Sequence, residues 1–291
     1  MMKVGIDSYS FHRYFGEIRE GLEEDPGKRW TVFDLIDFAG ELGIGGVSLE
    51  TCYMTALDPG FLRETRSKLD AYGLECVLAW GHPTGLEGGT NPTALEDLKQ
   101  HIPSALALGT STMRITASGS RYSPDLEPQF IRNVAPHLRE AVRAAADQGV
   151  VLALENHGDL SSDGLLRLIE LIDSPYLRVT LDTGNAQRIE DAVEATRKLA
   201  PYVAATHIKD VAGDSASRER GGFIPSTPIG KGTVNMPAIL RLLSEAGYEG
   251  LLCIEIDTTA PIWHNMAEEE MVSISVDYLR GELSRLAATS P

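Results

Sequence analysis

The sequence predicts an α/β fold, a single-domain (β/α)8 barrel (a TIM barrel), from three observations. A junction in which a helical pattern stops at a glycine and a strand follows recurs five times, as in ELGIGGVSLE and AYGLECVLAW. Eight strand-like runs begin near residues 3, 46, 74, 111, 150, 177, 202 and 250. Between them, apolar residues recur with helical spacing, for example Val32, Leu35, Ile36, Ala39 and Leu42. Eight strand-then-helix units are typical of this barrel.

The individual elements follow from local chemistry. Glycine adopts the left-handed conformation that commonly closes a helix, because it has no Cβ to clash. The five glycines that fill this role are Gly43, Gly73, Gly109, Gly149 and Gly247. The first strand is expected in KVGIDS, the sixth in YLRVTLD and the seventh in YVAATHI. The stretch MAEEEMVSISVDYLRGELSRL at 266–286 is expected to form a closing amphipathic helix.

Composition indicates one domain over residues 1–291, since no linker or low-complexity segment divides the chain. The formal net charge of −16 opposes broad contact with nucleic acid or anionic lipid, which need clustered Lys and Arg. Three cysteines form no CxxC pair, and the start lacks the apolar core of a signal peptide. No run reaches the ~18 apolar residues of a membrane span. We therefore expect a cytoplasmic protein without a membrane or nucleic-acid partner; homo-oligomerisation is left open.

Long connections follow the first strand (9–29) and the seventh strand (210–235). Both lie on the face where barrels of this type place their active sites. The second carries Arg218, Arg220 and Lys231 between glycines, and we expect it to form a lid over the site. The alternative is that this connection is an ordinary surface loop.

Four strand-like runs end on a side chain that can bind a metal: Glu155, Asp182, His207 and Glu255. Residues two apart on a strand share a face, and each of these follows a small or β-branched residue two places earlier, such as Ala153 or Ala205. The four side chains are therefore expected to point into the barrel and to converge at its mouth. Three converging carboxylates repel one another unless a cation neutralises them. A metal-free network of buried ion pairs is the alternative, which we disfavour because no lysine or arginine ends these strands.

The expected cofactor is one divalent metal ion. Three oxygen donors and one imidazole favour Mn²⁺, and leave Mg²⁺, Co²⁺ and Zn²⁺ open.

The sequence resembles the xylose-isomerase-like TIM-barrel superfamily of sugar phosphate isomerases and epimerases, over essentially its whole length. The segments that carry the resemblance are LALENH, LDTGN, THIKD and CIEI, whose Glu155, Asp182, His207 and Glu255 match the ordered metal ligands of that superfamily. Its ketose 3-epimerases usually have a substrate-binding His and Arg at positions that Asn185 and Gly213 occupy here.

Further side chains are candidates for substrate binding. Glu50 and Arg114 could contact substrate or pair with each other. His12, His82 and His157 lie just beyond strand ends, where an imidazole serves either catalysis or structure. Lys209 could bind an anionic group or pair with Asp210 or Glu255. The other candidates are Asn185 and the aromatic residues Tyr9, Phe11, Tyr14 and Phe15, which either wall the pocket or pack the loop.

These residues predict an enzyme that acts on a keto sugar or polyol derivative, a small carbohydrate. The metal stabilises an enediolate when a proton next to the carbonyl is removed. Glu155 and Glu255 are the expected proton-transfer groups, while Asp182 and His207 hold the ion. An isomerase or epimerase is the first reading. A lyase that decarboxylates, dehydrates or cleaves a C-glycoside on the same site is the alternative, and a nuclease similar to apurinic endonucleases or a silent binding subunit is more remote.

Overall fold

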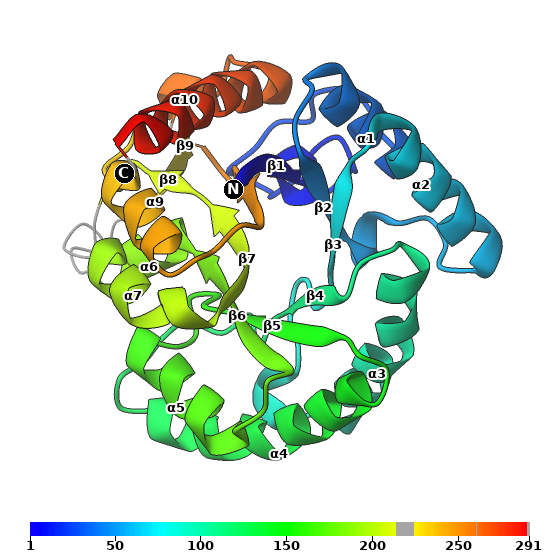
Figure 1. Cartoon of the computed structure of the whole chain (residues 1–291), viewed down its shortest axis with the longest axis vertical. Coiled ribbons are helices and arrows are strands. Elements are labelled where there is room, and N and C mark those ends of the chain that lie inside the picture. Colours follow the sequence, from blue (N-terminus) through cyan, green and yellow to red (C-terminus); the bar gives the residue numbers. More distant parts are fainter. Residues whose placement is uncertain (214–223, 260, 290–291) are drawn as a thin grey trace.

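Eight parallel strands close into a barrel in the computed structural model, which describes residues 1–213, 224–259 and 261–289. The order around the barrel is β1-β10-β7-β6-β5-β4-β3-β2, so the last strand pairs with the first (Figure 1). The strands are β1 (Lys3–Asp7), β2 (Gly46–Glu50), β3 (Glu75–Ala79), β4 (Thr112–Ile115), β5 (Val151–Glu155), β6 (Leu177–Asp182), β7 (Val203–Ile208) and β10 (Leu251–Ile254). The predicted (β/α)8 barrel is confirmed, and each strand begins within one residue of its predicted start.

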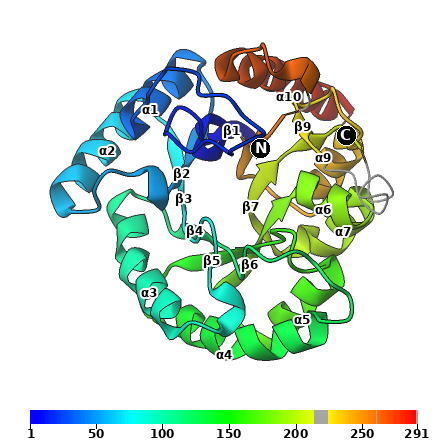
Figure 2. The ribbon, with the colours of Figure 1, turned by 180° about the vertical axis from the view of Figure 1, so that it is seen from behind.

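Helices form a ring outside the strands, as both face views show (Figures 1 and 2). They are α1 (Val32–Glu41), α2 (Pro59–Tyr72), α3 (Pro92–Ala107), α4 (Glu127–Ala146), α5 (Ser162–Ile172), α6 (Thr183–Ile189), α7 (Ala192–Leu199), α9 (Met236–Glu245) and α10 (Glu268–Thr289). The expected closing helix is α10. Within the described residues, no helix is long and apolar enough to span a membrane.

The glycines that close the helices have the predicted backbone conformation. Gly73 ends α2 with φ of 66° and ψ of 29°, and its N–H reaches back to the carbonyls of Asp70 and Leu69. The other four predicted glycines also have positive φ. A side chain at these turns would be strained, and the chain would enter the next strand at a different angle.

The barrel interior is narrow and filled by small side chains. Ala153, Ala205 and Cys253 form an inner cluster together with Val77 and Leu251. The residues that alternate with these along the same strands, such as Leu152, Leu154 and Leu252, belong to the larger core beneath the helices. The alternation predicted from the sequence is therefore confirmed, and it directs the last inward residue of each strand to the barrel mouth.

Two long connections leave the barrel on the side of the mouth. The β1 connection starts with a short 3-10 helix, η1 (Ser8–Phe11), and continues to α1. The β7 connection contains the antiparallel pair β8 (Asp210–Val211) and β9 (Ser226–Thr227). Arg218 and Arg220 lie outside the described residues, and Lys231 is exposed. The lid remains a prediction.

Candidate metal and substrate site

The four strand-end side chains meet at the barrel mouth. Glu155 and Asp182 are the last residues of β5 and β6, His207 lies in β7 and Glu255 follows β10. In the strand register, His207 pairs with Asp182 on one side and Cys253 on the other, so these ends lie at one level. One potential ligand atom from each of the four residues lies within 4.8 Å of the others, and all four residues are buried. The group could therefore hold a metal ion.

His207 has carboxylates on both sides of its ring. Its Nε2 is within ion-pair distance of Asp7 Oδ2, at 3.3 Å, although Asp7 Oδ2 has no hydrogen-bond partner among the described residues. Its Nδ1 lies 2.6 Å from Glu255 Oε2 and 3.5 Å from Glu155 Oε2. Yet neither His207 Nδ1 nor Glu255 Oε2 has a hydrogen-bond partner among the described residues. Buried polar atoms are normally satisfied, so these two atoms, which lack a hydrogen bond, suit the role of neighbouring ligands of one cation. The donor set and its orphaned atoms therefore suit a divalent metal.

Protonation of His207 depends on the same ion. Burial would lower the pKa of His207, but the carboxylates of Glu255, Glu155 and Asp7 outweigh it and raise that pKa well above the usual value. A metal needs the neutral imidazole, so binding of the ion would release a proton from this group.

Two cationic side chains enter the cluster, contrary to the expectation that no lysine or arginine compensates these acids. Arg114 Nε is 2.5 Å from Glu155 Oε2, and Arg114 Nη1 is 3.1 Å from Glu50 Oε1. Lys209 Nζ is 2.7 Å from Glu255 Oε1 and 3.1 Å from Asp182 Oδ2. The expectation was wrong because it considered only the last residue of each strand. Lys209 lies two residues beyond His207 and therefore shares its inward face.

The charges still leave an excess of acid. Six carboxylates meet here, and three cationic side chains oppose them; His207 is counted as neutral. The acids are Asp7, Glu50, Glu155, Asp182, Glu255 and Asp257, and the cations are Arg114, Lys209 and Arg188. With every carboxylate ionised and His207 neutral, as a bound metal requires, the excess would be three negative charges, which a divalent ion would reduce.

The pKa values of the acids diverge according to their partners. Burial would raise the pKa of Glu155, but Arg114 and His207 hold it well below the usual value. Lys209 and His207 likewise hold the pKa of Glu255 low against burial. Burial raises the pKa of Asp182 to about 7, aided by its carboxylate neighbours and opposed by Lys209. Glu155 and Glu255 are therefore ionised at neutral pH, which a proton acceptor requires.

A cavity of about 350 Å³ opens above this cluster. Six predicted substrate residues line it: Glu50, His82, Arg114, His157, Asn185 and Lys209. Asn185 Nδ2 donates to Asp182 Oδ2 at 2.8 Å and to Glu155 Oε1 at 3.3 Å, so it orients two of the cluster acids. His157 Nδ1 is 3.0 Å from the Ser118 carbonyl, and burial lowers the pKa of His157, which keeps the ring neutral.

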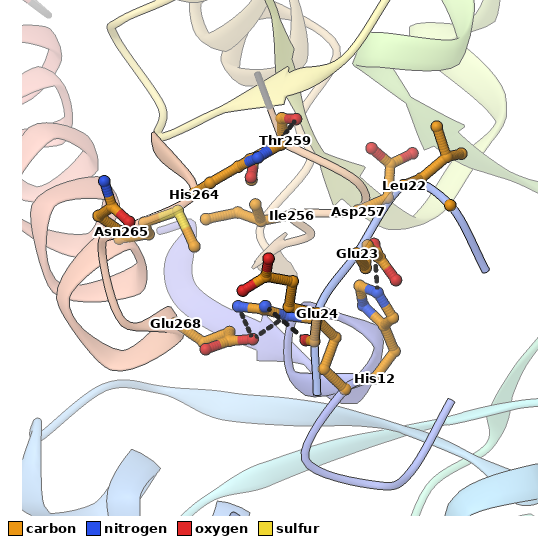
Figure 3. Close-up of a pocket in the computed structure, with 13 residues that line it drawn as sticks. His12, Leu22, Glu23, Glu24, Ile256, Asp257, Thr259, His264, Asn265 and Glu268 are labelled. Carbon is orange, nitrogen blue, oxygen red and sulfur yellow. Dashed lines mark hydrogen bonds and ion pairs between the residues drawn. The ribbon is translucent and has the colours of Figure 1, made fainter. Parts of the chain in front are cut away.

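His12 and three predicted aromatic residues do not line this cavity. His12 Nε2 is 2.9 Å from Glu23 Oε1, and the ring borders a second, larger cavity of about 550 Å³ beside α10 (Figure 3). Of the four aromatic candidates, only Tyr9 lines the cavity above the cluster, because Phe11 and Tyr14 pack on Trp30 and Phe15 stacks on Tyr53. The larger cavity borders none of Glu155, Asp182, His207 and Glu255, whereas the smaller one borders Glu255, so we place the chemistry in the smaller one.

Several residues of the site were not predicted. Asp7 ends β1 as Glu155 and Asp182 end β5 and β6, so the same pattern could have identified it. Asp257 accepts from Arg188 Nη1 at 3.0 Å and lies 3.4 Å from Lys209 Nζ. It lies two residues beyond Glu255 and shares its face, as Lys209 does with His207.

Comparison with known proteins identifies relatives along most of the chain. A family model described as xylose isomerase-like TIM barrel matches residues 36–281. The 3-oxo-isoapionate decarboxylase of Pectobacterium atrosepticum is 24% identical, covering 72% of this chain and 70% of that protein. The inosose dehydratase of Yersinia enterocolitica is 24% identical, covering 80% and 85%. A structure of L-ribulose 3-epimerase superposes with a TM-score of 0.72 at 17% identity, covering 99% and 96%.

Fold and site together define a (β/α)8 barrel with a buried group at its mouth that could hold a metal. The chain belongs to the xylose isomerase-like TIM barrel family, as its sequence resemblance predicted.

Proposed function

We propose that the protein is a divalent-metal-dependent enzyme that removes a proton next to the carbonyl of a keto sugar or polyol derivative. The observation that carries this proposal is the convergence of Glu155, Asp182, His207 and Glu255 within 4.8 Å at the barrel mouth. When bound there, a divalent ion acts as a Lewis acid that stabilises negative charge on the carbonyl oxygen. Mn²⁺ is the ion we propose for this donor set.

The side chains divide the remaining work. Asp182 and His207 hold the ion, with Asp7 fixing the imidazole from behind. Glu155 and Glu255 reach the site from β5 and from the end of β10, and each has one oxygen held by a cationic partner. These partners keep both groups ionised, so each is able to accept a proton. Return of the proton to another face or another carbon gives an epimerase or isomerase, which is our first candidate.

A lyase is the second candidate, favoured by specific observations. Asn185 and Gly213 stand where ketose 3-epimerases of the superfamily usually have His and Arg. The structure shows Asn185 occupied with Asp182 and Glu155. Two relatives are named a decarboxylase and a dehydratase. A nuclease receives no support, since the described residues contain one candidate metal-ligand group and the chain carries a net charge of −16.

The test is deuterium exchange from D₂O into a panel of keto sugars and keto polyols, with protein saturated in Mn²⁺. We expect exchange at the carbon next to the carbonyl, and a loss of ~10²–10⁴-fold in Glu155→Gln and Glu255→Gln. Asp182→Asn should instead weaken metal binding and recover with excess ion. The matched control is Glu75→Gln, at the opposite end of the barrel where β3 begins.

The products separate the two candidates. A product of unchanged mass indicates an isomerase or epimerase, and loss of water or carbon dioxide indicates a lyase. Near-normal exchange in both Glu variants would assign the base elsewhere, with His82 and His157 next. Activity that is unaffected by a chelator, together with no binding of any divalent ion, would refute the proposal.

A further inference from the structure

The cavity above the cluster is rich in cations, although the chain as a whole is acidic. Five of its lining residues are Arg or Lys and three are acidic. The cations are Arg19, Arg114, Arg121, Arg188 and Lys209, and the acids are Glu50, Glu255 and Asp257. In a protein with a net charge of −16, this local bias needs a reason.

Three of these cations are already neutralised. Arg114 pairs with Glu50 and Glu155, Lys209 pairs with Asp182, Glu255 and Asp257, and Arg188 pairs with Asp257. Arg19 and Arg121 differ, because neither has an acidic side chain within ion-pair distance in the part of the chain that the structure describes; Glu23 and Asp257 act on Arg19 only at longer range.

Arg19 is held in place by neutral groups. Its Nη1 donates to Thr258 Oγ1 at 2.6 Å, and its Nη2 donates to the Tyr9 hydroxyl at 2.5 Å. The Glu23 carboxylate links Arg19 and Thr258, because it accepts hydrogen bonds from the Arg19 backbone N–H at 3.0 Å and from the Thr258 hydroxyl at 2.8 Å. A guanidinium offers five N–H donors in a rigid fork, and two are used here. The others remain for a ligand, on a half-buried cation that has been fixed in advance.

Arg121 lies on the β4 connection and lines the same cavity as Arg19, which lies on the β1 connection. It is exposed and has no hydrogen bond or ion pair among the described residues. An exposed arginine alone is ordinary, but here it borders the cavity that Arg19 also borders. Two guanidinium groups without an ion-pair partner among the described residues thus border one cavity, which reaches the metal-ligand cluster at Glu255.

We propose that the substrate is an anionic sugar derivative, and that Arg19 and Arg121 bind its carboxylate or phosphate while its carbonyl end faces the cluster. Guanidinium groups bind both anions through paired, charge-assisted hydrogen bonds. This inference rests on the proposed function, because it names the substrate class of the same site.

Equilibrium binding to the Mn²⁺-loaded protein tests this without turnover. The probes are D-glucitol, D-gluconate and D-glucitol 6-phosphate, which share a carbon chain and differ in the terminal group. At least one anionic probe should bind ~10-fold or more tightly than glucitol. Arg19→Gln and Arg121→Gln should each weaken that probe by about 10-fold, in the range of a hydrogen bond to a charged group, and leave glucitol unchanged. The anionic probe that binds more tightly identifies the group that is recognised.

Matched variants exclude simpler explanations. Arg63→Gln makes the same charge change on the exposed face of α2 and should have no effect. Arg19→Lys keeps the positive charge but lacks the planar N–H donors of the guanidinium, so it should recover only part of the affinity for the anionic probe. Repeating the titrations in a chelator detects any affinity that comes from chelation of Mn²⁺ by gluconate.

Equal binding of the three probes would overturn the inference, as would an anion preference that survives in both Gln variants. Neither result bears on proton removal, which deuterium exchange reports separately.

Discussion

Replacement of Lys209 by Met should make the stability of the protein depend on metal. The Lys209 ammonium is buried between Glu255 Oε1 at 2.7 Å and Asp182 Oδ2 at 3.1 Å. Breaking a buried ion pair by removal of one partner typically costs ~3–5 kcal/mol. In a chelator, Lys209→Met should therefore lower the free energy of unfolding by about that amount, or the Tm by roughly 5–8 °C.

A divalent ion should offset much of this loss. Lys209 competes with the ion because its charge already lies beside two of the expected ligands, so the variant should bind Mn²⁺ more tightly than the wild type. The stability deficit should then shrink as Mn²⁺ is added, by ~1.4 kcal/mol for each tenfold gain in affinity once the site is saturated.

Urea unfolding with and without Mn²⁺, together with calorimetric titration, measures both quantities. Lys231→Met is the control, since it removes an exposed lysine of the same charge. A variant as stable as the wild type in a chelator would refute the reasoning. Weaker Mn²⁺ binding in the variant would also refute it, because Lys209 would then support the ion rather than compete with it.

Three further perturbations probe other parts of the molecule. Asp7→Asn should weaken metal binding ~10–100-fold, because it loosens the His207 ring, and a metal titration will show it. Burial would raise the pKa of Glu23, but the hydrogen bond and charge of His12 lower it to about 2 from 4.5. The stabilisation by Glu23, on the order of 2 kcal/mol after solvent screening, is thus present above pH 4.5 and lost as the pH falls toward 2. Unfolding curves of Glu23→Gln should converge with the wild type over that range, and a constant gap would contradict the assignment. Shortening of the 210–235 connection should reduce kcat/KM and leave metal affinity unchanged. An unchanged kcat/KM would contradict the prediction that this connection forms a lid.

Periodicity and strand ends were sufficient to predict the barrel and the convergence of four side chains. Both depend on local rules: glycine closes each helix, and alternation fixes which face of a strand Glu155 or His207 occupies. Those rules hold wherever the backbone is regular, so the predicted and observed strand starts agree within one residue.

The rules failed where side chains are long or the backbone is irregular. Arg114 extends from the middle of β4 to Glu155 on the next strand, a contact that the sequence did not predict. The pairs of Arg114 with Glu50 and of Lys209 with Glu255 were alternatives that the sequence left open, and the structure shows both. His12 follows η1, whose turn directs the ring to Glu23 and away from the cluster. Neither the reach of a flexible side chain nor the direction of a loop follows from residue spacing.

The pairing of β1 with β10 has a consequence for the order of events during synthesis. Val4 lies opposite Leu252 in the register, so closure of the barrel joins segments almost 250 residues apart. Asp7 and Glu255, which both contact His207, come from these two strand ends. A nascent chain that has not yet made β10 therefore cannot assemble the site, even if the first seven strands have already collapsed. Capture of a metal ion during translation should occur late, and it would report that the ring has closed.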